Sequence, residues 1–455
     1  MALDVPAVLA RLSADPVLRA IRAGCGEGGP LYLVGGYLRD RLLRRPHRER
    51  DIDLAAPGRV RELAESVAQH LGGSVVPLDQ RTVRVITFIE GASWQIDLSS
   101  LKGPSIEADL FARDFTIDAL GLPLEISNLK FQISNLVDPV GGLRDLEEGV
   151  VRMTHPQVFE EDPLRLLRAF RLAAGLGFSI EEKTNLAISE RAHLLSKVAG
   201  ERIKAELFKL LGSPRSTPYV KLLDEAGLLR QLIPGFETGE QAPHLEALRF
   251  LEGLVERLPT FFPRHAPWLL ERWQEEIEAH VERLGLVKLI ALYRHREPEA
   301  LSGLFARLRL GRRVKGLAAR IADFQNPKSQ IQDPNKVGPK ALYRFFRECE
   351  EVIPELILSA LADLWAQAEG REAFLCSKAF FEGMLDDVER FRKVQATPLL
   401  KGDDLIQALK LQPGPFLGFV LEKVKEAQFT GELGSKEEAL VFVRDNLERW
   451  RGASR

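Results

Sequence analysis

Hydrophobic and polar positions alternate in two different ways along the chain, and the change comes at Phe159. Before it, apolar runs over 31–36, 83–89 and 94–99 have the character of strands, and an amphipathic helical segment lies at 59–72. After it, nearly every segment has the i, i+3, i+4 spacing of amphipathic helices. The pattern predicts an α+β head with a mixed sheet and helices, followed by an all-α neck, body and tail.

The length of 455 residues is too great for one ordinary core. Within the head we expect one helix over Val5–Arg22 and an inserted hairpin over 125–136, and further along a linker over 326–340. We expect four parts, which are a head that holds the chemistry (1–150), a helical neck (151–215), a helical body (216–340) and a helical tail (341–455).

Composition narrows the class of protein. Charged residues make up 28% and apolar residues 45%, with a formal net charge of −2, so an RNA-binding surface would have to come from local basic clusters. No apolar run approaches the roughly eighteen residues of a membrane span, and the N-terminus lacks a secretory leader. Cys25, Cys349 and Cys376 are scattered, which argues against disulfides and a zinc ribbon. We expect a cytoplasmic protein, and nothing in the sequence sets its oligomeric state.

Two carboxylates stand out in an apolar, strand-like run. Asp51 and Asp53 are two residues apart, so in a strand both side chains point to the same face. Two like charges this close are costly without a cation between them, and oxygen ligands suit Mg²⁺. Asp97, on another predicted strand, is a third candidate ligand. The layout fits phosphoryl transfer assisted by two metal ions, although an isolated Asp-x-Asp is more often a solvated acidic face.

A glycine pair comes before these carboxylates. Gly35 and Gly36 would let backbone N–H groups approach a triphosphate closely. Arg39, in the helix that follows, can reach the same phosphates. Each feature is weak evidence alone, and their order along the chain strengthens the hypothesis.

Five ordered motifs then resemble those of the class II tRNA nucleotidyltransferase and bacterial poly(A) polymerase superfamily. They are LYLVGGYLRDRLLRR…RERDIDLAA, DLFARDFTIDALGLPL, DPVGGLRDLEEGVVR, FEEDPLRLLRAFRLAAGLGF and GERIKAELFKLL. The segment from PLLKGDDL to FTGEL also resembles the family's tail, whereas 216–395 match only loosely. The resemblance implies a nucleotidyltransferase palm in the head. It also implies Mg²⁺-dependent addition of CMP and/or AMP to the 3′ end of tRNA, with CTP and ATP as substrates and pyrophosphate released.

The resemblance also implies roles for individual residues. Asp51 and Asp53 would be the catalytic metal ligands. Asp114 would contact the ribose, and Asp162 and Arg165 would present an acceptor and donors to the Watson–Crick edge of the incoming base. The implied nucleotide-binding residues are Gly35, Gly36, Arg39, Arg113, Asp114, Asp162, Arg165, Arg168 and Arg171.

Simpler explanations exist for part of this set. Asp162 followed by Pro163 has the sequence of a helix N-cap and first helical position. Arg168 and Arg171 are also what a solvated helix face would carry. A cap that orients the Asp162 carboxylate is compatible with base contact, and the resemblance favours contact.

The chain departs from the family pattern at three places. Ala112 stands where an arginine is usual, and Asp118 stands where an asparagine is usual, so the role of position 118 is open. The segment 98–108 is short in a region where the family has a flexible loop associated with the switch from C to A addition. Its shortness indicates a CC-adding or an A-adding enzyme. His244 and His295 lack the His-Asp neighbours of a phosphohydrolase and are predicted to be surface or packing residues.

Two local basic clusters, 307–320 and 340–347, are candidate RNA contacts or ordinary solvated helix faces. Duplex RNA is recognised mostly by shape and backbone, so the helical half is expected to bind the acceptor stem of tRNA. The alternatives are a poly(A) polymerase, which often carries a basic C-terminal extension, and a non-catalytic RNA-binding protein on a degenerate head. Intact Asp51, Asp53, Arg39 and Arg165 argue against the last of these.

Overall fold

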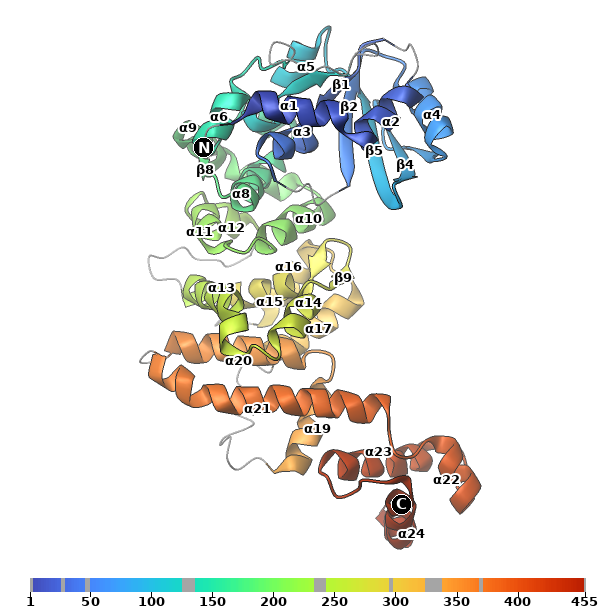
Figure 1. The fold of residues 1–455 in the computed structure, drawn as a ribbon. Helices are drawn as coiled ribbons and strands as arrows, with labels where there is room; N and C mark the ends of the chain where they lie inside the picture. The colour runs from blue at the N-terminus through green and yellow to red at the C-terminus, as the bar shows by residue number, and fades with distance from the viewer. Residues whose placement is uncertain are drawn as a thin grey trace. The chain divides into compact units, whose positions relative to one another are not determined.

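The structure is a computed structural model, and it describes residues 3–25, 29–45, 50–124, 136–232, 243–293, 298–323, 338–367 and 371–453. Its contacts divide the chain into two compact units, unit 1 (Met1–Thr238) and unit 2 (Gly239–Arg455). Unit 1 is blue to green in Figure 1 and unit 2 is yellow to red. The finer division into four parts stays a prediction.

Unit 1 is built on a six-stranded mixed sheet of order β3-β4-β5-β2-β1-β6. Its strands are β1 (Tyr32–Val34), β2 (Asp51–Ala56), β3 (Ser74–Pro77), β4 (Thr82–Ile89), β5 (Ala92–Ser100) and β6 (Gly121–Pro123). β2 and β5 are parallel, and the other neighbours are antiparallel. The α+β prediction is confirmed. β3 and β6 were not predicted, because three or four residues are too few to show an alternation.

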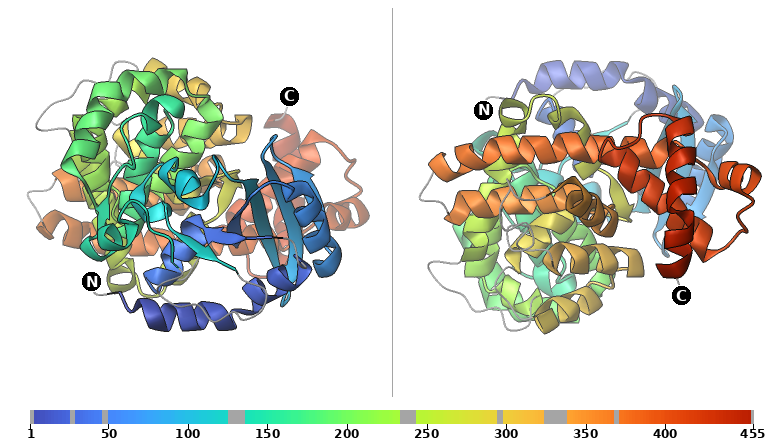
Figure 2. Two further views of the ribbon diagram at one scale, coloured as in Figure 1. Left: turned by 90° about the horizontal axis from the view of Figure 1, so that it is seen from above. Right: turned by 90° about the horizontal axis from the view of Figure 1, so that it is seen from below.

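One face of this sheet is covered by α4 (Val60–Leu71), which packs on β3, β4 and β5 (Figure 1, and the left view of Figure 2). Val83, Val85 and Thr87 of β4 are buried on this side, and the Thr87 hydroxyl donates to the Leu71 carbonyl at 2.9 Å. Since strand side chains alternate, the intervening residues of β4 point to the opposite face. That opposite face carries Asp51, Asp53 and Asp97.

The predicted single helix over Val5–Arg22 is wrong, because the segment forms two helices, α1 (Val5–Ala14) and α2 (Pro16–Gly24). Proline disfavours a helical conformation in the residue before it, and Asp15 is extended with ψ of 117°. The Asp15 carboxylate then caps α2 by accepting from the backbone N–H groups of Val17 and Leu18.

The remainder of unit 1 is mainly helical. Its elements are α3 (Gly35–Leu42), α5 (Ile106–Phe111), the 3-10 turn Thr116–Asp118, α6 (Gly142–Glu148), β7 (Val150–Val151), α7 (Val158–Glu161), α8 (Arg165–Leu176), β8 (Ser179–Ile180), α9 (Glu182–Arg191), the 3-10 segment Ala192–Lys197, α10 (Gly200–Leu211), α11 (Thr217–Glu225) and α12 (Leu228–Leu232). The apolar face of α8 is buried, as predicted, and packs on α10 and α11. Of the predicted hairpin at 125–136, all but Leu136 lies outside the described residues.

Unit 2 is helical, as predicted, apart from one short two-stranded ribbon. Its elements are α13 (Pro243–Phe261), α14 (Ala266–Trp273), β9 (Glu276–Glu278), β10 (Val281–Glu282), α15 (Arg283–Leu292), α16 (Pro298–Arg307), α17 (Arg312–Asp323), α19 (Pro339–Cys349), α20 (Ile353–Gln367), α21 (Arg371–Ala396), α22 (Gly402–Leu409), α23 (Pro415–Phe429) and α24 (Lys436–Ala453). Within the described ranges, no helix has both the length and the apolar character needed to cross a membrane.

The two basic clusters differ in structure. In 340–347, Tyr343, Phe345 and Phe346 are buried, and the cations face glutamates of α23 and the turn after it. This arrangement favours a packing role for 340–347. The cluster 307–320 spans the end of α16 and most of α17, whose basic side chains are largely exposed. His295, the side chain of His244 and most of the predicted linker at 326–340 lie outside the described residues.

Candidate active site

A glycine allows the carboxylate strand and the first turn of α3 to meet. Gly35 has φ of +74°, and a Cβ added there would lie 2.6 Å from Oδ2 of Asp53. Val34 pairs with Asp53 across β1 and β2, so the turn sits directly beside the carboxylate. A residue with a side chain at position 35 would be strained and would also displace Asp53. Gly36 follows in the first turn of α3.

Asp51 and Asp53 lie on the face of the sheet opposite α4, as the alternation predicted. Asp53 pairs with Asp97 across β2 and β5, so the third carboxylate is its direct neighbour. Both oxygens of Asp97 accept from Arg84, each at 2.7 Å. Asp97 is therefore engaged by Arg84 through both oxygens, which makes it less suited than Asp53 to bind a metal.

Burial, together with the nearby carboxylates of Asp51 and Asp97, raises the pKa of Asp53 to about 6 against the opposing effect of Arg113. A bound cation would remove this cost. Among the described residues there is no cluster of three or more metal-ligating side chains. Two carboxylates nevertheless fit Mg²⁺, which usually keeps waters and takes further oxygens from substrate phosphates.

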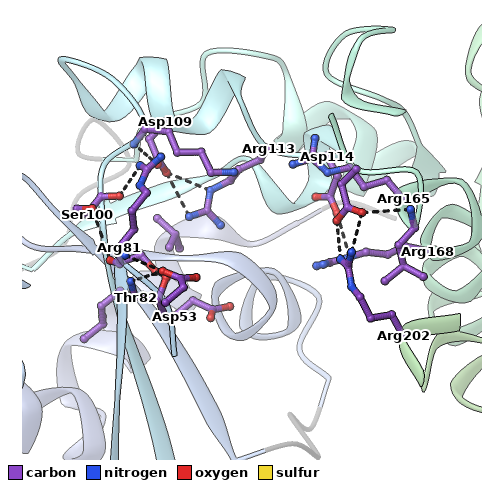
Figure 3. A pocket seen from close by; sticks show the side chains of 17 residues that line it. Asp53, Arg81, Thr82, Ser100, Asp109, Arg113, Asp114, Arg165, Arg168 and Arg202 are labelled. Atoms are coloured by element: carbon purple, nitrogen blue, oxygen red, sulfur yellow. Dashed lines mark hydrogen bonds and ion pairs between the residues drawn. The ribbon is translucent and has the colours of Figure 1, made fainter. Parts of the chain in front are cut away.

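A cavity of about 430 Å³ opens beside Asp53, a size that suits a small ligand (Figure 3). Its wall contains six cations, which are Arg81, Lys102, Arg113, Arg165, Arg168 and Arg202. Burial and the neighbouring cations, Arg165 foremost, lower the pKa of Lys102, and only Asp109 raises it. Crowded cations in a partly dry site favour a bound anion such as a triphosphate.

The second motif supplies the wall nearest the sheet. The Arg113 guanidinium donates to Oδ2 of Asp109 at 3.3 Å, and Oδ1 of Asp109 accepts from the backbone N–H of Lys102 at 2.8 Å. Asp114 is buried and lies 2.9 Å from Nε of Arg168 on α8. The two residues of this motif thus face different parts of the cavity, as Figure 3 shows.

The opposite wall comes from α8 and α10. Asp162 forms a two-pronged ion pair with Arg202, at 2.7 and 3.2 Å. The predicted N-cap with Pro163 at the first helical position is wrong in register, because α8 begins at Arg165 after a turn. Oδ1 of Asp162 still accepts from the backbone N–H of Leu164 at 3.2 Å, so the turn does orient the carboxylate. Arg165 pairs with Glu161 at 3.1 Å.

Arg39 is placed differently from the prediction. Its guanidinium is buried and donates to Asp118 at 2.6 Å and to Asp40 at 2.9 Å. Burial opposes its charge, but the two carboxylates outweigh this and raise the pKa of Arg39. Arg168 lies 3.8 Å from the other oxygen of Asp118. The unusual aspartate at position 118 thus lies between two arginines, which offset its charge.

The structure brings most of the predicted residues to the cavity and leaves some away from it. Those that line it are Asp53, Arg113, Asp114, Asp162, Arg165 and Arg168. Gly35, Gly36, Arg39, Asp51 and Arg171 are not in its wall. Arg171 instead pairs with Glu206 of α10 at 2.8 Å.

The sequence did not single out five of the charged lining residues, which are Asp79, Arg81, Lys102, Asp109 and Arg202. Asp109 and Arg202 belong to the second and fifth motifs, so the resemblance could have drawn attention to them. Arg81 and Lys102 lie in connections at the ends of strands and have no motif of their own.

Comparison with known proteins agrees with this site. Residues 31–152 match the family described as the poly A polymerase head domain, and 177–239 match "Probable RNA and SrmB-binding site of polymerase A". The chain is 32% identical over 421 residues to the CC-adding tRNA nucleotidyltransferase of Geobacter sulfurreducens, covering 90% of this chain and 91% of the relative. It is 30% identical over 446 residues to the A-adding tRNA nucleotidyltransferase of Deinococcus radiodurans, covering 92% and 95%.

Solved structures extend the comparison to the fold. The Thermotoga maritima CCA-adding enzyme complexed with tRNA is similar with a TM-score of 0.67 and 25% identity, over 98% of this chain and all of that one. A CCA-adding enzyme complexed with ATP gives a TM-score of 0.69 at 25% identity, over 98% of each chain. Sequence, fold and site agree, and the chain belongs to the tRNA nucleotidyltransferase family.

Proposed function

We propose that this protein extends the 3′ end of tRNA with nucleotides from CTP and/or ATP, releasing pyrophosphate and using Mg²⁺ at Asp51 and Asp53. The observation that carries the proposal is the paired carboxylates on an open sheet face beside a cation-rich cavity. The attack of an RNA 3′ hydroxyl on a nucleoside triphosphate needs both the carboxylates and the cations. Charge must be neutralised on the attacking oxygen and on the leaving pyrophosphate.

Different residues of the site are placed to bind different parts of the substrate. Mg²⁺, when bound, supplies charge neutralisation of the triphosphate and of the attacking hydroxyl. Lys102 and Arg113 are placed to bind phosphate oxygens, and Asp114 to accept from a ribose hydroxyl. Asp162 and Arg165 offer an acceptor and donors for the base edge. Asp162 is paired with Arg202, so base contact requires that pair to open or to share an oxygen.

We infer that the reaction is the partial, CC-adding one. The connection between β5 and α5 is only 101–105, in the region where the family's flexible loop is associated with the switch to A addition. The CC-adding relative from Geobacter sulfurreducens, 32% identical, supports the same inference. The A-adding relative at 30% identity makes A addition the competing outcome.

The helical remainder would hold the tRNA. The match of 177–239 to an RNA-binding family region and the tRNA-bound structural neighbour support this role. A protein that acts on tRNA in this way is expected in the cytoplasm. A poly(A) polymerase shares the head motifs, and substrate tests separate the two.

The test uses tRNA that lacks CCA, CA or A, and an oligo(A) primer, each with CTP or ATP alone. The proposal predicts two C residues added to tRNA lacking CCA, one added to tRNA lacking CA, and none from ATP on tRNA ending in CC. Incorporation only from ATP on tRNA ending in CC would identify an A-adding enzyme. Many A residues on any primer would identify a poly(A) polymerase, and no incorporation at all would overturn the enzymatic proposal.

A further inference from the structure

Two apolar side chains lie exposed on the same sheet face as the metal-binding carboxylates. Phe88 is 73% exposed and Ile86 is 36% exposed, and both belong to β4, the second strand in the sheet order. Their neighbours Val85 and Thr87 are buried under α4, so Ile86 and Phe88 point to the opposite side. Exposed aromatic side chains on an active-site face point to a contact with a ligand.

Strand register places these residues relative to the carboxylates. Asp51 pairs with Gln95 of β5, and Gln95 pairs with Ile86 of β4, so the three lie in one row across the sheet. Phe88 pairs with Ser93 in the next row on the same face. With a strand spacing of about 4.8 Å and a rise of about 3.3 Å per residue, Ile86 is roughly 10 Å and Phe88 roughly 12 Å from Asp51.

The cavity lies toward the other end of the same strands. Its wall includes Thr82 at the start of β4 and Ser99 and Ser100 at the end of β5. Along the strands the order is therefore the cavity, then Asp53, then Asp51 level with Ile86, and finally Phe88. In phosphoryl transfer the attacking and leaving oxygens lie roughly in line on opposite sides of the phosphorus. If the cavity holds the triphosphate, the RNA carrying the attacking hydroxyl arrives from the Phe88 side.

We propose that Ile86 and Phe88 form a stacking platform for the unpaired nucleotides just before the 3′ end of the RNA. The proposal rests on the proposed function, since it takes the RNA to be the acceptor. Aromatic side chains bind single-stranded bases with little dependence on sequence, because every base has a π-face. Such tolerance suits an acceptor whose terminal nucleotide changes with each addition.

The surroundings of the platform match a nucleic acid better than a protein partner. Gln95 and Ser93 beside it offer donors and acceptors to bases or sugars. The β4–β5 turn is tight, with φ of +51° at Glu90 and +76° at Gly91, which is typical of a two-residue type I′ hairpin. The turn holds Phe88 on a regular strand, so the ring is presented in a fixed position.

The kinetic test compares Phe88→Ala with Phe88→Tyr, which keeps the ring, and with Gln69→Ala, an exposed residue of α4 on the other side of the sheet. Loss of one stacked base predicts a rise in KM for tRNA on the order of ten-fold for Phe88→Ala. The KM for CTP should change by less than about two-fold on the same reasoning. Phe88→Tyr and Gln69→Ala should behave like the wild type. An unchanged KM for tRNA in Phe88→Ala would overturn the platform, as would an equal rise in both KM values.

A binding test keeps this proposal separate from the proposed function. tRNA with 2-aminopurine at each of its last three nucleotides in turn reports stacking by fluorescence quenching, without any reaction. The platform predicts quenching at one of these positions that Phe88→Ala removes and Phe88→Tyr retains. If quenching depends on Phe88 but no nucleotide is incorporated, only the proposed function fails. If nucleotides are incorporated but quenching does not depend on Phe88, only the platform fails.

Discussion

A buried cation in unit 2 and a buried carboxylate in unit 1 have different partners. In unit 2, Arg283 is 3% exposed and pairs with Glu275 at 2.8 Å and with the buried Glu355 at 3.3 Å, so this cation is matched by carboxylates. In unit 1, the cations near Asp53 do not offset its burial, and its pKa rises to about 6. The matched charges serve the fold, whereas the uncompensated carboxylate is a cost that a bound cation would remove.

The largest effect should come from removing the uncompensated charge. Asp53→Asn keeps the shape of the side chain but loses a metal ligand, so incorporation should fall by at least about three orders of magnitude. The folded-state pKa of about 6 lies above the ordinary 3.8, so the cost of ionising the buried carboxyl builds up between these two pH values and is complete above pH 6. The variant should therefore be more stable at pH 7.5, by about 1–2 kcal/mol, with the gain shrinking as pH falls from about 6 to about 4.

Steady-state nucleotide incorporation measures the loss of activity. Urea unfolding at pH 7.5 and at about pH 4 measures the change in stability. A variant that is inactive and also less stable than the wild type at pH 7.5 would show that Asp53 supports the fold and would break the contrast between the units.

Removing a buried charge that is paired with carboxylates should lower the stability of the protein. Arg283→Met leaves Glu355 buried without its closest cation, which should cost about 3–5 kcal/mol of stability. Arg313→Ala is the matched control, because its side chain is 58% exposed and pairs with Glu351 at the surface, where ion pairs contribute about 0–1 kcal/mol. Urea unfolding followed by tryptophan fluorescence measures both. Equal stability of the two variants would contradict a structural role for the buried pair.

This contrast also explains how far the sequence could predict the site. Asp51 and Asp53 follow from strand alternation alone, because their geometry is set by neighbours two residues apart. The ion pair between Asp162 and Arg202 joins residues 40 positions apart in the sequence. It depends on the packing of α8 against α10. The prediction that Arg39 binds phosphates did not include its contact with Asp118. That contact depends on the fold of the head. Local periodicity thus predicted the strands, and tertiary pairing decided which side chains line the cavity.

A substitution of Arg165, in the cavity wall formed by α8 and α10, should have an intermediate effect. Arg165→Ala removes donors from the cavity, so discrimination between CTP and other nucleotides should fall by about ten- to a hundred-fold, as expected for lost hydrogen bonds to a base edge. Arg171→Ala is the control on the same helix, because its side chain pairs with Glu206 away from the cavity. The ratio of kcat/KM values for CTP and UTP measures the effect. An equal loss with every nucleotide in Arg165→Ala would count against base selection.

The smallest effect is expected at position 118. Asp118→Asn keeps an acceptor for Arg39 but removes the negative charge 3.8 Å from Arg168. The potential at the cavity becomes more positive, so the KM for CTP should fall by about two- to five-fold. Asp40→Asn, which changes the other carboxylate on Arg39, is the control and should have less effect at the cavity. A rise in the KM for CTP would show that the aspartate is needed for binding.

Binding of Mn²⁺, followed by electron paramagnetic resonance in the presence of CTP, tests most directly that Asp51 and Asp53 hold the metal. Asp51→Asn and Asp53→Asn should each lose most of the bound Mn²⁺. Asp97→Asn is the sharpest comparison, because Asp97 is the cross-strand neighbour of Asp53 but is engaged by Arg84 through both oxygens. The account predicts that Asp97→Asn binds Mn²⁺ nearly as well as the wild type. Retained binding in Asp53→Asn, or its loss only in Asp97→Asn, would contradict the account.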